Sequence, residues 1–205
     1  SFLPKDYEFI FLCSEDHLRE TNMREVLKNA VPDKTIVTIK GDLKGPAHSS
    51  LFALEHIRDE EEVLVTYCDT IQVCDFYDFL KKIRQIRPDG ELLSFKGFHP
   101  ASLGETYYGY LKVDGNGFLE ELREKQSFTD NRINEHASSG VYYFSSGKIF
   151  KKYIQELVSK ESNAVNGEFY SSLLLNLMLR DNLKVLNPER MMVIMCESDR
   201  FSVYN

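Results

Sequence analysis

The sequence predicts an α/β protein with a mixed, mostly parallel sheet flanked by helices. Short apolar runs rich in valine, isoleucine and aromatic residues alternate along the chain with segments whose apolar residues recur at helical spacing. Alternation of this kind favours right-handed βαβ units. The 205 residues are enough for one sizeable core, and neither an internal repeat nor a linker divides them. We therefore expect a single domain over residues 1–205.

In the first half of the chain, strands are expected at residues 7–13, 35–39, 63–68 and 92–95. A helix over about 21–29 is expected to begin with Thr21 as its N-cap. The next helix follows a glycine- and proline-containing turn at 41–46 and places Leu51, Leu54 and Ile57 on one face. A third helix, at about 76–86, ends at the breaker sequence Arg-Pro-Asp-Gly.

The second half begins with a hairpin. Residues 107–113 alternate like a strand at a sheet edge, and 118–122 return after the turn Asp-Gly-Asn-Gly, whose glycine and asparagine accept positive φ. Another strand is expected at 140–144. Two helices should follow, one over about 150–158 and one from near Glu168 to near 181–182. Residues 184–186 and 191–196 are the expected closing strands.

Composition narrows the function. The net charge of −7 argues against a nucleic-acid surface. Scattered histidines give no zinc pattern, and four cysteines without Cys-x-x-Cys spacing indicate reduced thiols in the cytoplasm. No segment reaches the apolar length of a membrane span, and the first five residues do not resemble a signal peptide. A local phosphate site could still be lined by basic residues: Lys40, Lys44, Lys96, Arg123 and Lys125.

The apolar run at 63–68 stops on a carboxylate, Asp69. In open α/β sheets, ligands bind beyond the carboxyl ends of the strands. Asp69 is therefore expected at the mouth of a site, where its oxygens could hold Mg²⁺ against a phosphate. The alternative is that Asp69 caps the helix that follows, and residue type alone favours the cap. The rest of the chain has to decide between them.

Two further motifs have both a binding and a structural interpretation. Glycine in the stretch 40–47, Gly45 among them, lets the backbone approach a ligand, or it serves a turn before a helix. Aromatic residues and glycine around Lys96, and the strand start Tyr108-Gly109, suit a sugar ring that stacks on one face. Their alternative role is packing, which composition alone favours.

Three more motifs are equally open. Glu124-Lys125 could accept hydrogen bonds from sugar hydroxyls and neutralise a phosphate, or it could be an ordinary surface charge pair. Small residues at Ser139-Gly140 permit close approach of a ligand, or they form a tight strand start. Glu168 could project into a cleft, or it could stabilise the first turn of a helix that begins at 166 or 167.

Taken in order, these motifs resemble the sugar-phosphate nucleotidyltransferases, such as glucose-1-phosphate thymidylyl- and cytidylyltransferases, from about Tyr7 to Tyr204. The resemblance implies a Rossmann-like nucleotide-binding fold. It also implies transfer of a nucleotidyl group from a nucleoside triphosphate to a sugar 1-phosphate, with release of pyrophosphate. Asp69 would bind Mg²⁺ and Lys125 would hold the sugar phosphate, and these two are the expected catalytic residues. The expected substrate-binding residues are Gly45, Lys96, Tyr108, Gly109, Glu124, Ser139, Gly140 and Glu168.

The sequence departs from this family in three places. The family's glycine-rich, arginine-containing triphosphate loop does not occur, so we expect a domain truncated at its N-terminus. Asp199 is the expected second metal ligand, but residues 196–201 replace an aromatic-Gly-Thr-Pro-like turn. Ser138-Ser139 stands where many members carry asparagine, which leaves the sugar unidentified. The expected partners are a nucleoside triphosphate and a sugar phosphate, with no nucleic acid and no membrane, and a homo-oligomer stays open.

Two other functions remain. One is a non-catalytic nucleotide-sugar-binding module of the same fold, which the absent loop and the altered residues 196–201 motivate. The other is a glycosyltransferase, which would share the sheet and a metal-bound aspartate. Glycosyltransferases usually place two acidic residues around the metal, whereas residues 67–70 offer one.

Overall fold

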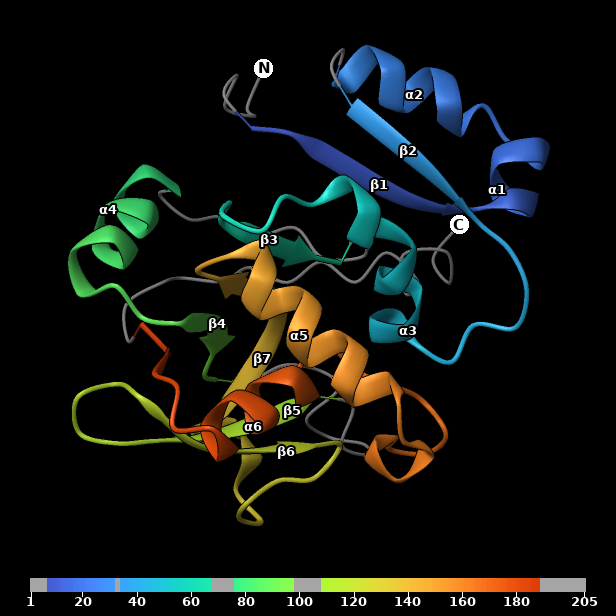
Figure 1. Cartoon of the computed structure of the whole chain (residues 1–205). Helices are drawn as coiled ribbons and strands as arrows, with labels where there is room; N and C mark the ends of the chain where they lie inside the picture. Colours follow the sequence, from blue (N-terminus) through green and yellow to red (C-terminus); the bar gives the residue numbers. More distant parts are fainter. Residues whose placement is uncertain (1–6, 32–33, 68–75, 98–107, 189–205) are drawn as a thin grey trace.

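The computed structural model describes residues 7–31, 34–67, 76–97 and 108–188 (Figure 1). The strands are β1 (Phe9–Ser14), β2 (Lys34–Ile39), β3 (Val63–Thr66), β4 (Gly90–Phe95), β5 (Gly109–Val113), β6 (Leu119–Glu124), β7 (His136–Phe144) and β8 (Val185–Leu186). The α-helices are α1 (Glu15–Glu20), α2 (Met23–Ala30), α3 (Pro46–Ser50), α4 (Phe76–Ile86), α5 (Gly147–Val158) and α6 (Leu173–Arg180). The 3₁₀ helices are η1 (Leu51–His56), η3 (Arg132–Asn134) and η4 (Glu161–Asn163).

The larger sheet is organised around β7. Its order is β6-β5-β7-β4-β8, and β3 also pairs with β7. β4 lies along one edge of β7 from Ala137 to Phe144. The opposite edge is shared, because β3 pairs with Val141–Phe144 and β5 pairs with His136 and Ala137. The stretch of β7 between these two pairings is where the sheet opens.

Strand directions differ in part from the expectation of a mostly parallel sheet. β1 pairs with β2 in parallel and β4 with β8 in parallel, whereas the pairings of β3, β4 and β5 with β7, and of β5 with β6, are antiparallel. The mixed α/β character is confirmed. β3 and β4 do run in the same direction, but β7 is inserted between them. The apolar pattern of β7 carries no information about its direction, so the sequence could not reveal this insertion.

Helices cover both faces of this sheet. Because successive strand residues point to opposite faces, Leu92 and Tyr142 pack with α5 and α6, while Leu93 and Tyr143 pack with α4. Figure 1 shows α5 and α6 lying together across one face. The α5–α6 side holds the larger core, and each fully buried leucine or phenylalanine in it contributes roughly 1.5–3 kcal/mol. No helix in the described ranges is long and apolar enough to cross a membrane.

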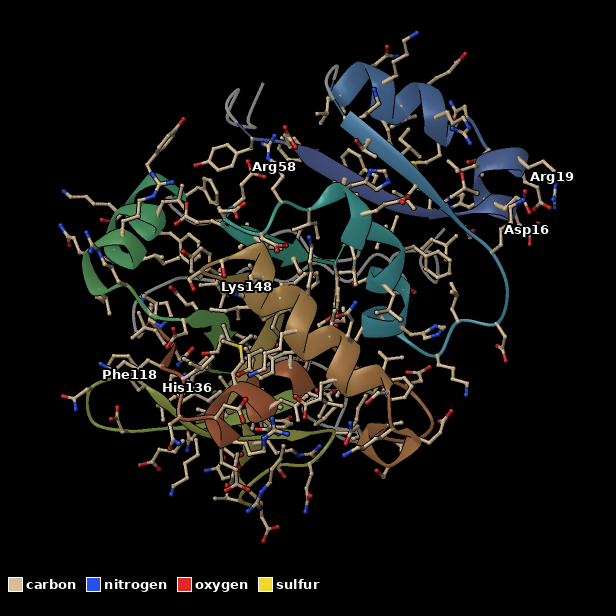
Figure 2. All side chains as sticks on the ribbon, in the orientation of Figure 1. Asp16, Arg19, Arg58, Phe118, His136 and Lys148 are labelled. Atoms are coloured by element: carbon tan, nitrogen blue, oxygen red, sulfur yellow. The ribbon has the colours of Figure 1, made fainter. Side chains whose placement is uncertain are left out.

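The sheet of β1 and β2 forms a smaller unit with α1 and α2. Its register runs from Phe9 opposite Lys34 to Ser14 opposite Ile39. Most residues of these strands are half-buried rather than buried. Arg58, in the loop before β3, lies near the start of β1 (Figure 2) and pairs with Glu8 at 3.2 Å. It also pairs with Glu61 of its own loop.

Two expected helices near the N-terminus have different bounds. The helix expected at 21–29 is α2, and a separate helix, α1, precedes it with Ser14 as its cap, accepting from the backbone N–H of His17. The N-cap position of α2 is held by Asn22, not by Thr21. The Thr21 hydroxyl donates to the carbonyl of His17 at 2.7 Å and accepts from the backbone N–H of Met23 at 3.2 Å. The helix expected after Pro46 is a short α-helix that tightens into the 3₁₀ helix η1.

The expectation of a helix starting near Glu168 was wrong. Asn166 and Gly167 have φ of 52° and 81°, and Val165 exchanges two backbone hydrogen bonds with Glu168. Asn-Gly at the centre of a two-residue turn favours this reversal over a helix start. The helix α6 begins five residues later, at Leu173. The closing strand expected at 191–196 lies outside the described residues.

Candidate functional site

The sheet opens where β3 ends and β5 begins. The pairing of β3 with β7 stops at Val141, and that of β5 resumes at Ala137. Between them, the backbone N–H of Tyr67 donates to the carbonyl of Gly140 at 3.3 Å. In open α/β sheets, ligands bind beyond the carboxyl ends of the strands. Here the carboxyl end of β3 lies next to the start of β5. Asp69 would follow this point directly, but it lies outside the described residues, as does Asp199.

Glu124 stands at the end of β6, beside this opening. It pairs with Gly109 on β5, and a Cβ atom at Gly109 would come within 2.8 Å of Oε2 of Glu124. The carboxylate therefore occupies the space that a side chain on β5 would otherwise fill. Oε2 accepts a hydrogen bond from the hydroxyl of Ser172, at the start of α6. The sequence motif placed Glu124 at the site, but neither the Gly109 space nor Ser172 was expected.

The electrostatics of this corner reflect burial. Burial raises the pKa of Glu124, while the hydrogen bond from Ser172 and the charge of Lys125 oppose that rise. Burial also raises the pKa of Tyr67 and of Tyr142, whose rings lie 5.9 Å apart. A carboxylate among neutral phenols in a poorly hydrated corner is a strong hydrogen-bond acceptor.

Lys125 takes a left-handed backbone conformation, with φ of 58°. Its backbone N–H donates to the carbonyl of Tyr108 at 3.0 Å. Its ammonium lies 5.0 Å from the centre of the Tyr170 ring. The Tyr170 hydroxyl in turn donates to Oε2 of Glu168. These contacts connect Tyr108, Lys125 and Glu168, which the sequence analysis had named separately.

Gly45 joins the same region from the loop before α3. It has φ of 93°, and a Cβ atom there would lie 2.8 Å from the carbonyl oxygen of Phe169. The backbone N–H of Phe169 donates to the carbonyl of Lys44, and that of Ala47 donates to the carbonyl of Phe169. The loop and the residues after Glu168 thus run side by side, which only glycine permits at this position.

The remaining expected residues are less directly placed for a ligand. Ser139 is fully buried, and its hydroxyl donates to the carbonyl of Leu93 at 2.8 Å. Gly140 has φ of 81°, and its missing side chain makes room for the ring of Tyr67. Lys96 is exposed and follows β4. Across the described ranges, no group of three or more His, Cys, Asp and Glu residues is arranged to hold a metal ion.

Sequence reasoning missed three residues of this corner. Tyr67 precedes Asp69 by two positions and belongs to an apolar strand pattern, which gave it only a packing role. Tyr170 and Ser172 were treated as the start of a helix. The turn Asn166-Gly167 was the signal that could have placed them before α6.

The arrangement favours a hydroxyl-rich ligand that carries an anionic group. Glu124 offers a carboxylate acceptor and Lys125 an ammonium. The space beside Gly109 is taken by Glu124 itself, and that beside Gly140 by the ring of Tyr67. A pyranose has hydroxyls that can donate to the Glu124 carboxylate and an apolar face that can pack on an aromatic ring such as that of Tyr67.

Comparisons with known proteins bear on this arrangement. The family model described as nucleotidyl transferase matches residues 39–175. The bifunctional protein GlmU of Staphylococcus epidermidis is 26% identical over 166 residues, which cover 78% of this chain but 34% of that protein. The chain thus spans about a third of the length of the curated relatives it matches.

Two solved structures have the same fold. A nucleoside-diphosphate-sugar pyrophosphorylase from Vibrio cholerae has a TM-score of 0.73 and 20% identity, with 97% of this chain and 80% of that chain covered. A Bacillus anthracis protein provisionally named a glucose-1-phosphate thymidylyltransferase has a TM-score of 0.61 and 12% identity, with coverage of 92% and 89%. At these identities the likeness concerns the fold alone.

Proposed function

We propose, since this chain belongs to the nucleotidyl transferase family, that it acts in the transfer of a nucleotidyl group from a nucleoside triphosphate to a sugar 1-phosphate. An oxygen of the sugar phosphate attacks the α-phosphorus, the bond to the β-phosphate oxygen breaks, and pyrophosphate leaves. Such chemistry needs mainly positioning and charge neutralisation. The observation that carries the proposal is the grouping of Glu124, Lys125 and Gly109 at the opening between β3 and β5.

Each residue has a distinct role in this proposal. Glu124 accepts hydrogen bonds from sugar hydroxyls through the oxygen that Ser172 does not hold. Lys125 binds the phosphate of the sugar, with its ammonium held over Tyr170. Gly45 and its loop approach the nucleotide, and the Tyr108-Gly109 backbone and Glu168 contact the substrates from β5 and the segment before α6. Lys96, Ser139 and Gly140 are proposed substrate contacts as well, Ser139 through its backbone.

Asp69 and Asp199 are the proposed ligands of Mg²⁺. When bound, the ion would neutralise charge on the triphosphate. A cytoplasmic location is part of the same proposal, since nucleoside triphosphates are available there.

The test is pyrophosphate release by the full-length natural protein. Nucleoside triphosphates and sugar 1-phosphates are offered in all pairs with MgCl₂. We expect one pair to give pyrophosphate, and Lys125→Ala to lower the rate by at least tenfold. Lys112→Ala is the matched control, because Lys112 is an exposed lysine on β5 that pairs with Glu120. Absence of turnover with any pair would contradict the proposal.

Two further measurements identify the alternative functions, a nucleotide-sugar-binding module and a glycosyltransferase. Calorimetric binding of a nucleotide sugar without pyrophosphate release would identify a binding module. Transfer of the sugar to an acceptor, again without pyrophosphate, would identify a glycosyltransferase.

A further inference from the structure

Ser172 occupies the N-cap position of α6, yet its side chain makes no capping hydrogen bond. An N-cap serine ordinarily accepts a hydrogen bond from a backbone N–H of the first turn. Here the first N–H groups of the helix already have backbone partners. Those of Leu173 and Leu174 donate to the carbonyls of Tyr170 and Ser171, and that of Leu175 donates to the carbonyl of Ser172. The hydroxyl of Ser172 is therefore not needed to start the helix.

That hydroxyl donates to Oε2 of Glu124 instead. Ser172 is fully buried, with 0% of its surface exposed. A hydrogen bond to a carboxylate is among the stronger ones in proteins. The buried hydroxyl of Ser172 therefore bonds the carboxylate of Glu124 rather than the N-terminus of α6.

One turn further along α6, Asn176 fixes the same strand. Its amide donates to the carbonyl of Leu122 at 2.8 Å and accepts from the backbone N–H of Leu122 at 3.2 Å. Ser172 and Asn176 lie four residues apart, on one face of the helix. Leu122 and Glu124 lie two residues apart, on one face of β6. The helix thus fixes this edge strand at two matching points.

The space around Oε2 is filled from the other side as well. Gly109 lies opposite, where even a Cβ atom would come within 2.8 Å of Oε2. Oε2 is held between Ser172 and the backbone of β5. No hydrogen bond to Oε1 is found within the described residues, so Oε1 is the oxygen left to accept from a ligand.

We propose that Ser172 is a positioning residue: its hydroxyl holds Oε2 of Glu124, so that Oε1 accepts a hydrogen bond from a hydroxyl of the bound sugar. The inference rests on the proposed function, because it assigns Glu124 to the sugar. It adds a residue that touches no substrate and acts through the carboxylate alone.

The first test is independent of any substrate. In protein labelled at the glutamate carboxyl carbon, NMR titration reports the pKa of Glu124. Ser172→Ala removes a hydrogen bond that lowers this pKa, so the pKa should rise in the variant. Ser146→Ala is the control, since Ser146 caps α5 in the ordinary way, accepting from Ile149, and it should leave Glu124 unchanged. An unaltered Glu124 titration in Ser172→Ala would overturn the inference.

The second test measures binding of the sugar 1-phosphate. Ser172→Ala should weaken it on the order of tenfold, leave the KM for the nucleoside triphosphate unchanged, and move the low-pH limb of sugar binding to higher pH. Ser172→Thr, which keeps the hydroxyl, should recover most of the affinity. Ser146→Ala should lower only thermal stability.

A double-mutant cycle separates positioning from general destabilisation. If Ser172 acts through Glu124, then adding Ser172→Ala to Glu124→Gln should cause little further loss of sugar binding. Equal losses in both backgrounds would contradict the inference. Failure of the wild-type protein to bind any sugar phosphate would instead contradict the proposed function, while the NMR result would still decide whether Ser172 holds Glu124.

Discussion

Gly109 and Glu124 face each other across the β5–β6 pairing, and the carboxylate of Glu124 fills the space that a side chain at Gly109 would take, 2.8 Å from the position of its Cβ. A glycine on one strand is therefore paired with an acidic residue on the next. The proposed sugar contact depends on this pairing, because it fixes how far the carboxylate reaches toward the opening at β7.

Gly109→Ala should displace the carboxylate of Glu124. Since an error of about 1 Å in a positioning group can cost up to a hundredfold in rate, we expect the KM for the sugar 1-phosphate to rise by roughly ten- to a hundredfold. The control is Gly115→Ala, because a Cβ at Gly115, in the hairpin turn, meets nothing within 4 Å. Steady-state kinetics on both variants checks this, and equal KM values would refute the role of the space.

Gly140→Ala should destabilise the fold. Gly140 has φ of 81°, and a Cβ there would lie 3.0 Å from the ring of Tyr67. The left-handed conformation alone costs about 1–2 kcal/mol for alanine. Gly41→Ala isolates this backbone cost, because Gly41 has φ of 92° and open space around it. Urea unfolding should show the larger loss for Gly140→Ala, and equal losses would mean that Tyr67 adjusts freely.

The aromatic ring of Tyr170 should hold Lys125. Tyr170→Phe keeps the ring under the ammonium and should change the KM for the sugar phosphate by less than about threefold, whereas Tyr170→Leu removes the ring and should raise it by roughly three- to tenfold. Kinetics at low and high salt measures the difference. A larger effect of Tyr170→Phe would instead assign the contribution to the hydrogen bond with Glu168.

The stability of the protein should fall as pH rises through the range set by Glu91. This residue on β4 is 2% exposed, and burial raises its pKa to about 8. Among the residues that the structure describes, its Oε2 has no hydrogen-bond partner. In the unfolded chain the carboxyl loses its proton near its ordinary pKa of about 4.3. The contribution of Glu91 to the free energy of unfolding is therefore at its maximum below that pH. It is lost progressively up to about pH 8.

Glu91→Gln removes this titration. Urea unfolding between pH 5 and pH 9 should therefore show a flatter profile in the variant, with a gain of the order of 1–3 kcal/mol over wild type at the alkaline end. Glu121→Gln, at an exposed position on β6, should leave the profile unchanged. Parallel profiles for wild type and Glu91→Gln would contradict the burial of an ionisable carboxyl.

The turns, strands and helices that depend on neighbouring residues could be predicted from the sequence. The hairpin turn was readable because its glycines and asparagine accept positive φ. In the structure Gly117 has φ of 83°, and Asp114 accepts from the backbone N–H groups of Asn116 and Phe118, both at 2.8 Å. Most strands and both long helices were placed by the spacing of their apolar residues, which is also a local pattern. Asn166-Gly167 was misread because a polar residue and glycine before an acidic residue suit either a helix start or a tight turn.

Long-range pairing was the part that could not be predicted. The insertion of β7 between β3 and β4 depends on tertiary contacts that no local pattern encodes. The motif Glu124-Lys125 was recognisable, but its contact with Gly109 depends on strand register, and that with Ser172 on where α6 begins. Asp69 and Asp199 remain predictions.

Nucleotidyl transfer by this protein can be followed through the reverse reaction. The full-length natural protein is incubated with radiolabelled pyrophosphate, MgCl₂ and each of a panel of UDP-, dTDP-, CDP- and GDP-sugars. We expect label to enter a nucleoside triphosphate only when the matching nucleotide sugar is present, and Gly109→Ala and Lys125→Ala each to reduce the exchange by at least tenfold. If no nucleotide sugar of the panel supports exchange, or if neither variant changes the exchange rate, the proposed function is contradicted.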